Sequence, residues 1–209
     1  SLEDYPSNLM DVGVYQGERL LLPFWFAPDF LISSKATEEK YGLELRGQMT
    51  CDQFLEACRP AAEDGLPLIG TYLPFSTYLQ AINLPIADYE QKKPLVNTPE
   101  FREACEFYQS FYPQMAEYLD REGESYQANA FDRLCKGQAL FTLDLYGAEK
   151  SMIQFDTILR QETGQGISAY PFPSPVENDA KYALTNAAVG VSETCRLPEE
   201  AFDYIVEFL

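Results

Sequence analysis

The 209-residue chain has 46% hydrophobic residues, a formal net charge of -18 and a pI near 4.2. This apolar fraction is enough for a buried core, whereas the negative charge opposes binding to nucleic-acid phosphates and anionic membrane surfaces. The longest apolar stretch, LLLPFWFAP at 20–28, is shorter than the ~20 residues that a membrane-spanning helix needs. We therefore predict a globular protein that neither binds nucleic acid nor spans a bilayer.

Short apolar runs and helical patterns alternate along the chain. Strands separated by helices, with few hairpin signals, predict an α/β fold with a largely parallel sheet. In chain order, we expect a strand at 18–26, a strand at 30–34, a helix at 34–42, a helix at 50–65, an apolar run at 66–70, a helix in the second half of 71–84, a loop or small hairpin at 87–97, a helix at 97–112, a helix at 129–137, a strand at 139–145, a helix at 148–161, a strand at 167–171, a strand at 186–192 and a helix at 197–209.

The helix expected at 50–65 begins with a capping box, because Thr50 is followed three residues later by Gln53. Phe54, Leu55 and Cys58 fall on one face of this helix, which predicts burial of that face. Pro60 lacks the backbone N–H that a helix interior uses, so we expect it to kink or split the helix.

The helix expected at 97–112 has the clearest pattern. Thr98 is its expected cap, and Pro99 stands at the first helical position. Aromatic and apolar residues then recur at spacings of four, three and four, which predicts one buried face. The residues of that face are Phe101, Cys105, Tyr108 and Tyr112.

The chain contains no histidine, which removes the usual general base and the usual catalytic zinc ligand. The cysteines are five in number and form no C-x-x-C pair, which fits neither a disulfide framework nor a zinc site. We expect most of them to be small buried residues and predict neither a metal site nor a cofactor. They are Cys51, Cys58, Cys105, Cys135 and Cys195.

Three of the expected strands end in aromatic residues, and one of them also ends in a carboxylate. In parallel α/β sheets the ligand crevice lies beyond the carboxyl ends of the strands. Aromatic faces with a carboxylate suit sugars, and they also suit small cations. Taken singly, each aromatic can instead belong to the core, and Asp144 can instead cap the following helix. The residues are Tyr72 and Phe75, Asp144 and Tyr146, and Tyr170 and Phe172.

The sequence favours a protein that is not an enzyme. A glycosidase needs two carboxylates about 5 to 9.5 Å apart, and no second acid stands at an expected strand end. The chain has no dinucleotide-binding, phosphate-loop, nucleophile-elbow or EF-hand motif. The acidic runs at 36–44 and 121–125 are interpreted as solvated faces.

The order of these segments resembles the extracellular solute-binding proteins of ABC importers, family 1, which include the maltodextrin-binding and other sugar-binding proteins. The likeness covers nearly the whole chain. The segments that carry it are YQGERLLLPFWFAPDFLISSKATEEKYGLE, MTCDQFLEACR, NTPEFREACEFYQSFY, NAFDRLCKGQALFTLDLYGA, ISAYPFPSP and NAAVGVSETCRLPEEAFDYIVEFL.

The chain departs from the pattern of this family at three places. Cys51 replaces the usual tryptophan, which puts one packing contact in doubt. Ser33 and Ser34 replace a Tyr-Asn pair, and Phe141 replaces the common methionine. None of these changes affects the expected fold.

The resemblance implies a periplasmic-binding-protein-like fold of type II, in which crossover strands join two α/β lobes. Residues 1–24 then correspond to the end of the first lobe and a hinge strand, 25–171 to the second lobe, and 172–209 to the segment that returns to the first lobe. The chain would be a fragment that holds mainly the C-terminal lobe and half of a ligand cleft.

The resemblance also implies a function: non-catalytic binding of a solute, most simply a sugar, with hinge closure and delivery to ABC permease subunits. Such proteins are extracytoplasmic, either in the periplasm or as lipoproteins whose anchor lies outside this chain. Two alternatives are a lobe of a carbohydrate-active hydrolase and a sensor or scaffold module with the same fold. The implied ligand-binding residues are Trp25, Tyr72, Phe75, Asp144, Tyr146 and Asn186, with Trp25 open to a packing role instead.

Overall fold

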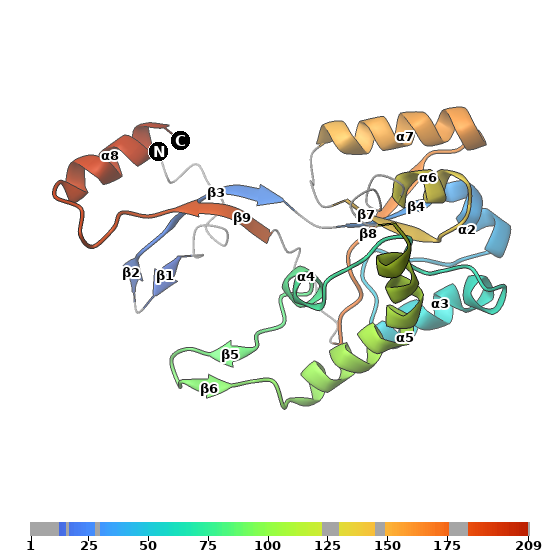
Figure 1. The fold of residues 1–209 in the computed structure, drawn as a ribbon, viewed down its shortest axis with the longest axis horizontal. Helices are drawn as coiled ribbons and strands as arrows, with labels where there is room; N and C mark the ends of the chain where they lie inside the picture. Colours follow the sequence, from blue (N-terminus) through green and yellow to red (C-terminus); the bar gives the residue numbers. More distant parts are fainter. Residues whose placement is uncertain are drawn as a thin grey trace. The chain divides into compact units, whose positions relative to one another are not determined.

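The computed structural model describes residues 13–15, 17–27, 30–122, 130–144, 149–175 and 184–208 (Figure 1). Helices and strands alternate along the chain, so the α/β class is confirmed. The chain divides into two compact units: unit 1 comprises Ser1–Pro28 and Ala183–Leu209, and unit 2 comprises Asp29–Tyr182. Among the described helices, none combines the length and apolar character needed to cross a membrane.

Unit 2 contains most of the secondary structure. Its described strands are β4 (Phe30–Ser34), β5 (Ala87–Asp88), β6 (Lys93–Pro94), β7 (Phe141–Asp144) and β8 (Ile167–Tyr170). Its described helices are α2 (Lys35–Tyr41), α3 (Cys51–Glu63), α4 (Phe75–Ala81), α5 (Pro99–Glu122), α6 (Ala130–Cys135) and α7 (Glu149–Thr163). The expected small hairpin is confirmed, because β5 and β6 pair antiparallel.

The sheet of unit 2 has the order β7-β4-β8, and both outer strands run antiparallel to β4. The expectation of a largely parallel sheet is therefore wrong for these pairs. Alternation of helices and strands predicts parallel pairing only when consecutive strands are neighbours, and β4 instead pairs with strands more than a hundred residues away. A parallel element is present, since Ile69 forms an isolated parallel bridge with Phe141.

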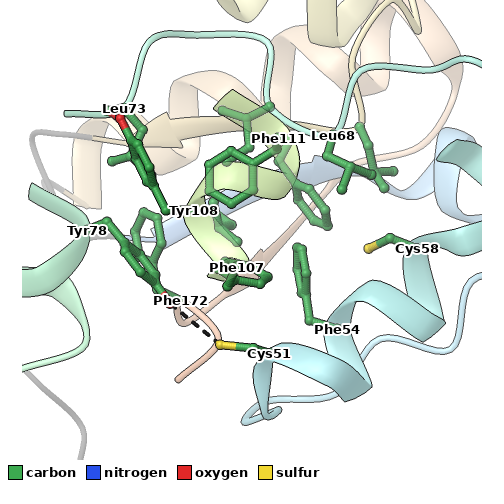
Figure 2. Close-up of a cluster of buried hydrophobic side chains, with 14 of the residues drawn as sticks. Cys51, Phe54, Cys58, Leu68, Leu73, Tyr78, Phe107, Tyr108, Phe111 and Phe172 are labelled. Carbon is green, nitrogen blue, oxygen red and sulfur yellow. Dashed lines mark hydrogen bonds between the residues drawn. The ribbon is translucent and has the colours of Figure 1, made fainter. Parts of the chain in front are cut away.

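The larger core of unit 2 lies between one face of this sheet and helices α3, α4 and α5 (Figure 2). Phe54 of α3 is central: its ring centroid lies 5.9 Å from Phe107 of α5, edge to face, and 5.3 Å from Phe141 of β7. Such aromatic pairs add about 0.5–1.5 kcal/mol beyond the burial of their area. Helices α6 and α7 cover the opposite face, where Ile32, Leu134 and Leu159 form a smaller core.

Helix α3 confirms its predicted start and corrects its predicted break. The N–H of Gln53 donates to Thr50 Oγ1 at 3.3 Å, and the N–H of Thr50 donates to Gln53 Oε1 at 3.1 Å. The helix continues through Pro60 to Glu63, so Pro60 does not split it. Burial of Phe54 and of residues one and two turns further on holds the helix together across the lost hydrogen bond.

Helix α5 begins as predicted, with the N–H of Phe101 donating to Thr98 Oγ1 at 3.2 Å. Its buried face differs from the prediction: Tyr108 is buried, but Tyr112 is 40% exposed. The predicted face and the face that is buried lie next to each other on the helix and share Tyr108. Packing against α3 and α4 determines which of the two is buried. The buried residues are Ala104, Phe107, Tyr108, Phe111 and Met115.

All five cysteines are free, but only Cys51 and Cys58 are buried, so the expectation that most would be buried is wrong. Burial raises the pKa of Cys51 to about 11 and that of Cys58 to about 12. Both thiols are therefore protonated at neutral pH and act as small apolar side chains.

Unit 1 contains β1 (Val14–Tyr15), β2 (Glu18–Arg19), β3 (Leu22–Ala27), β9 (Leu184–Val189) and α8 (Pro198–Phe208). The strand expected at 18–26 is divided into β2 and β3, because the N–H groups of Leu20 and Leu21 turn to the carbonyl of Gly13. Strand β3 pairs antiparallel with β9, and β1 pairs with β2.

Candidate functional site

Several strands of unit 2 end at one edge of the sheet. Strands β7 and β8 run in the same direction, since both are antiparallel to β4, and the 67–70 segment runs parallel to β7. The register places Asp144 opposite Phe30 and Tyr170 opposite Leu31, at the beginning of β4. The ends of β7, of β8 and of 67–70 therefore share this edge, although the strand between β7 and β8 runs the other way.

Tyr72 and Phe75 follow the 67–70 segment and meet at Tyr108 of α5. The Tyr108 hydroxyl donates to the carbonyl of Leu73 at 2.7 Å, and the rings of Phe75 and Tyr108 have centroids 4.9 Å apart. Burial raises the pKa of Tyr108 to about 12, and the nearby hydroxyls of Tyr72 and Tyr112 act in the same direction. Tyr72 and Phe75 are half-buried against the core, so each offers only part of its ring to a ligand.

Tyr170, at the end of β8, hydrogen bonds to a carboxylate that sequence reasoning missed. Its hydroxyl donates to Glu38 Oε2 at 3.2 Å, and Ser168 Oγ donates to the same oxygen at 3.1 Å. Burial raises the pKa of Tyr170, and the Glu38 charge adds to the increase. The interpretation of the run at 36–44 as a solvated face is therefore wrong for Glu38. Nothing in the sequence around Glu38 indicates this hydrogen bond.

Phe172 belongs to the core. It is buried, and its ring centroid lies 6.3 Å from that of Tyr78. Tyr78 in turn donates to the carbonyl of Pro173 at 3.2 Å and lies 3.6 Å from Cys51 Sγ (Figure 2). Cys51 occupies the position of a tryptophan in the family that the sequence resembles. In this chain, it makes a buried contact with the aromatic residue Tyr78.

The remaining predicted residues of unit 2 are only partly covered. Asp144 is the last residue of β7, while its side chain lies outside the described positions. Tyr146 lies outside the described residues altogether. Its role in stacking on a ligand stays a prediction, as does the choice between ligand binding and helix capping for Asp144.

Trp25 and Asn186 lie in unit 1, on the paired strands β3 and β9, at an irregular stretch of the register. Pro23 pairs with Ala188 and Trp25 with Ala187, which leaves Phe24 as an extra residue in β3. The next pair, Phe26 with Thr185, leaves Asn186 as an extra residue in β9. Such irregularities re-aim side chains and are common beside binding sites; the side chains of Trp25 and Asn186 themselves lie outside the described positions.

A hollow of about 480 Å³ lies elsewhere on unit 2, beside α3. It is lined mainly by polar side chains, among them Arg46, Gln53 and Arg59, and Arg59 is paired with Glu56 at 2.7 Å. None of the predicted ligand residues lines it. Over the described residues, no group of three or more His, Cys, Asp or Glu side chains is arranged to hold a metal ion.

Comparison with solved structures finds proteins that share the fold of this chain. The sugar-binding protein MalE from Xanthomonas citri matches with a TM-score of 0.67 and 13% identity, covering 98% of this chain and 52% of MalE. Maltose-bound T. maritima MalE3 matches with a TM-score of 0.56 and 19% identity, over 100% of this chain and 55% of MalE3. The chain has the fold of ABC substrate-binding proteins.

A third structure with this substrate-binding-protein fold is Lmo0181 from Listeria monocytogenes in complex with cycloalternan, with a TM-score of 0.57, 16% identity and coverage of 98% of this chain and 51% of Lmo0181. The chain thus spans about half the length of each of these proteins. Models of known protein families give no match, and neither do curated protein sequences.

Proposed function

We propose that this chain is part of a non-catalytic solute-binding protein that binds a carbohydrate. The observation that carries the proposal is the fold, which this chain shares over nearly its whole length with sugar-binding ABC substrate-binding proteins. The ends of β7, of β8 and of the 67–70 segment, which carry or precede Asp144, Tyr170 and Tyr72, support it, because aromatic rings and a carboxylate suit sugar rings and hydroxyl pairs.

The proposal extends to the organisation and partners of the whole protein. Residues 1–24 and most of 172–209 would belong to one lobe and residues 25–171 to the other, close to the bounds of units 1 and 2. Phe172, which packs in the core of unit 2, would stay with the second lobe. The lobes would close around the sugar by a hinge motion and present it to ABC permease subunits outside the cytoplasm. The proposed ligand residues are Trp25, Tyr72, Phe75, Asp144, Tyr146 and Asn186.

A thermal-shift screen of the full natural protein against sugars, amino acids and polyamines tests the proposal. A ligand that binds only the native state raises the midpoint of thermal unfolding by mass action, so a sugar should raise it in a concentration-dependent way. Stabilisation by a polyamine or an amino acid, with no response to sugars, would contradict carbohydrate binding.

The ligand residues are tested with Tyr146→Ala, which should weaken sugar binding by ~1 kcal/mol or more, on the scale of one aromatic contact. Tyr89→Ala is the matched control, because Tyr89 is 73% exposed on the β5–β6 hairpin and is not a proposed ligand residue. Equal affinity of the Tyr146 variant and the control would remove Tyr146 from the site. Turnover of chromogenic glycosides that disappears in Asp144→Asn would instead indicate a hydrolase.

A further inference from the structure

Three buried side-chain oxygens on and beside β4 have no hydrogen-bond partner among the described residues: Ser33 Oγ, Ser34 Oγ and Glu38 Oε1. Buried polar atoms in folded proteins nearly always have a partner, either in the protein or in an ordered water. Three such atoms within six consecutive residues therefore indicate a local feature of the fold.

Ser33 and Glu38 face the same side of the sheet. Ser33 is opposite Ser168 in the β4–β8 register, and residues directly opposite each other point to the same face. Ser168 Oγ donates to Glu38 Oε2 at 3.1 Å, so the Glu38 carboxyl group lies over the row that Ser33 and Ser168 form. Ser34 points to the opposite face, because side chains alternate along a strand.

The second carboxyl oxygen of Glu38 requires a hydrogen-bond donor. Within the described part of the chain, no Lys or Arg forms an ion pair with Glu38, and its two hydroxyl donors, from Ser168 and Tyr170, both reach Oε2. Burial, together with the nearby Glu38 charge, raises the pKa of the Cys58 thiol to about 12, so that neighbour is neutral. A hydroxyl such as that of Ser33 can both donate and accept.

We propose that one internal water molecule bridges Glu38 Oε1 and Ser33 Oγ. It donates one hydrogen to the carboxylate and bonds the serine hydroxyl with its second hydrogen or a lone pair. The bridge connects helix α2 to β4 and fixes the carboxylate of Glu38. This carboxylate accepts the hydrogen bond from Tyr170, the last residue of β8. Water fits better than a metal ion, because the donors around the position are one carboxylate and hydroxyl groups.

A high-resolution crystal structure of the protein tests this inference. We expect a density peak within hydrogen-bonding distance of both Glu38 Oε1 and Ser33 Oγ. The Ser33→Ala variant should lose the peak, and oxygen-17 magnetic relaxation dispersion should detect fewer long-lived internal waters in solution. Ser34→Ala is the matched control, since it removes a buried, unpartnered hydroxyl from the adjacent residue on the opposite face and should leave the peak unchanged.

Several results would overturn the inference. In the wild-type crystal, the absence of density at this position would contradict it, and so would a Ser33 hydroxyl that donates to a backbone carbonyl. A peak that rubidium replaces in a soaked crystal would identify a cation instead of water. Persistence of the peak in Ser33→Ala, or its loss in Ser34→Ala, would equally contradict the assignment of Ser33 as a partner of the water.

Discussion

The two units of the chain differ in how they bury their apolar residues. In unit 2, the sheet is covered by packed side chains on both faces, and Phe54 is 1% exposed. In the part of unit 1 whose side chains are described, only Leu22 and Pro23 are buried. The exposed large apolar residues of unit 1 are Val14, Tyr15, Leu20, Leu21, Phe24, Leu197, Phe202 and Tyr204.

This difference shows that a segment can form helices and strands without forming a buried apolar core. Strands β3 and β9 of unit 1 pair with each other through their backbone groups, and α8 begins at Pro198, one residue after the start of the helix expected at 197–209. Backbone pairing alone contributes little net free energy, whereas burial of apolar area is the dominant favourable term in folding. The stability of the described structure should therefore reside almost wholly in unit 2.

The largest expected effect is that of Phe54→Ala in unit 2. Removing this buried ring leaves a cavity between α3, α5 and β7, so we expect a loss of about 3–5 kcal/mol in the free energy of unfolding. The matched control is Phe24→Ala in unit 1, where Phe24 is 46% exposed, and its effect should stay within about 0.5 kcal/mol.

Denaturant unfolding with two probes measures this pair of variants. The only tryptophan, Trp25, lies in β3, so its fluorescence reports on unit 1, whereas far-UV circular dichroism is dominated by the helices of unit 2. We expect the fluorescence transition at lower denaturant concentration, and Phe54→Ala should shift mainly the dichroism transition. Coincident transitions that both variants shift equally would show that the two units form one cooperative body.

Local sequence signals predicted most elements of both units, though not the short strand β1, and they did not predict how strands pair or which helix face is buried. The capping box at Thr50 and the cap at Thr98 act within one turn, and both were correct. The parallel sheet and the buried face of α5 were wrong, because both depend on contacts between segments far apart in sequence, such as β4 with β7. Tertiary packing overrides a weak local preference.

The candidate site was predictable to a similar degree. The rule that aromatic residues after strands mark a binding edge led to Tyr72 and Phe75, which follow the 67–70 segment. In the structure, both lie beside Tyr108 of α5. It could not separate edge from core, since Phe172 follows β8 in the same way and is buried. Glu38 gave no signal, because its partners Ser168 and Tyr170 are 130 and 132 residues away.

A smaller effect is expected for Tyr78→Phe, which removes one buried hydroxyl from the core of unit 2. The carbonyl of Pro173 then loses its donor at 3.2 Å, and the thiol of Cys51 loses its contact at 3.6 Å. Leaving such buried groups unpaired costs about 1–3 kcal/mol. Thermal or urea unfolding measures the loss, with Tyr204→Phe on exposed α8 as the control; an unchanged stability would show that another donor replaces the hydroxyl.

Thr50→Ala is expected to cost about 1 kcal/mol, because it removes half of the capping box at the start of α3. Its control in unit 1 is Thr194→Ala, where the hydroxyl lies in an exposed turn and hydrogen bonds to that of Ser192 at 3.0 Å. Urea unfolding compares the two variants. Equal effects would indicate that α3 is held by its buried face alone, and Thr50→Ser, which keeps the cap, should restore wild-type stability.

The smallest effect comes from Asp156, a half-buried residue that connects α7 to β8. Its carboxylate accepts from Arg160 Nε at 2.6 Å and from the N–H of Ile167 at 3.0 Å, and these bonds, that of Arg160 foremost, lower the pKa of Asp156 below its ordinary value of 3.8. A lowered pKa means that the folded state favours the ionised form, so the stabilisation is fully present above the ordinary pKa and is lost as the pH falls through the lowered one.

Asp156→Asn should therefore be slightly less stable than the wild type at pH 7, and the difference should vanish in acid as the wild-type carboxylate becomes protonated. Urea unfolding over a series of pH values measures both curves. Asp203→Asn on α8 of unit 1 is the control, because it removes an exposed carboxylate and leaves the hydrogen bonds of Asp156 in place. A difference in the free energy of unfolding between Asp156→Asn and the wild type that stays constant down to strongly acidic pH would mean that packing, not charge, causes the loss of stability. The α7–β8 connection would then contribute to the stability of unit 2 independently of ionisation.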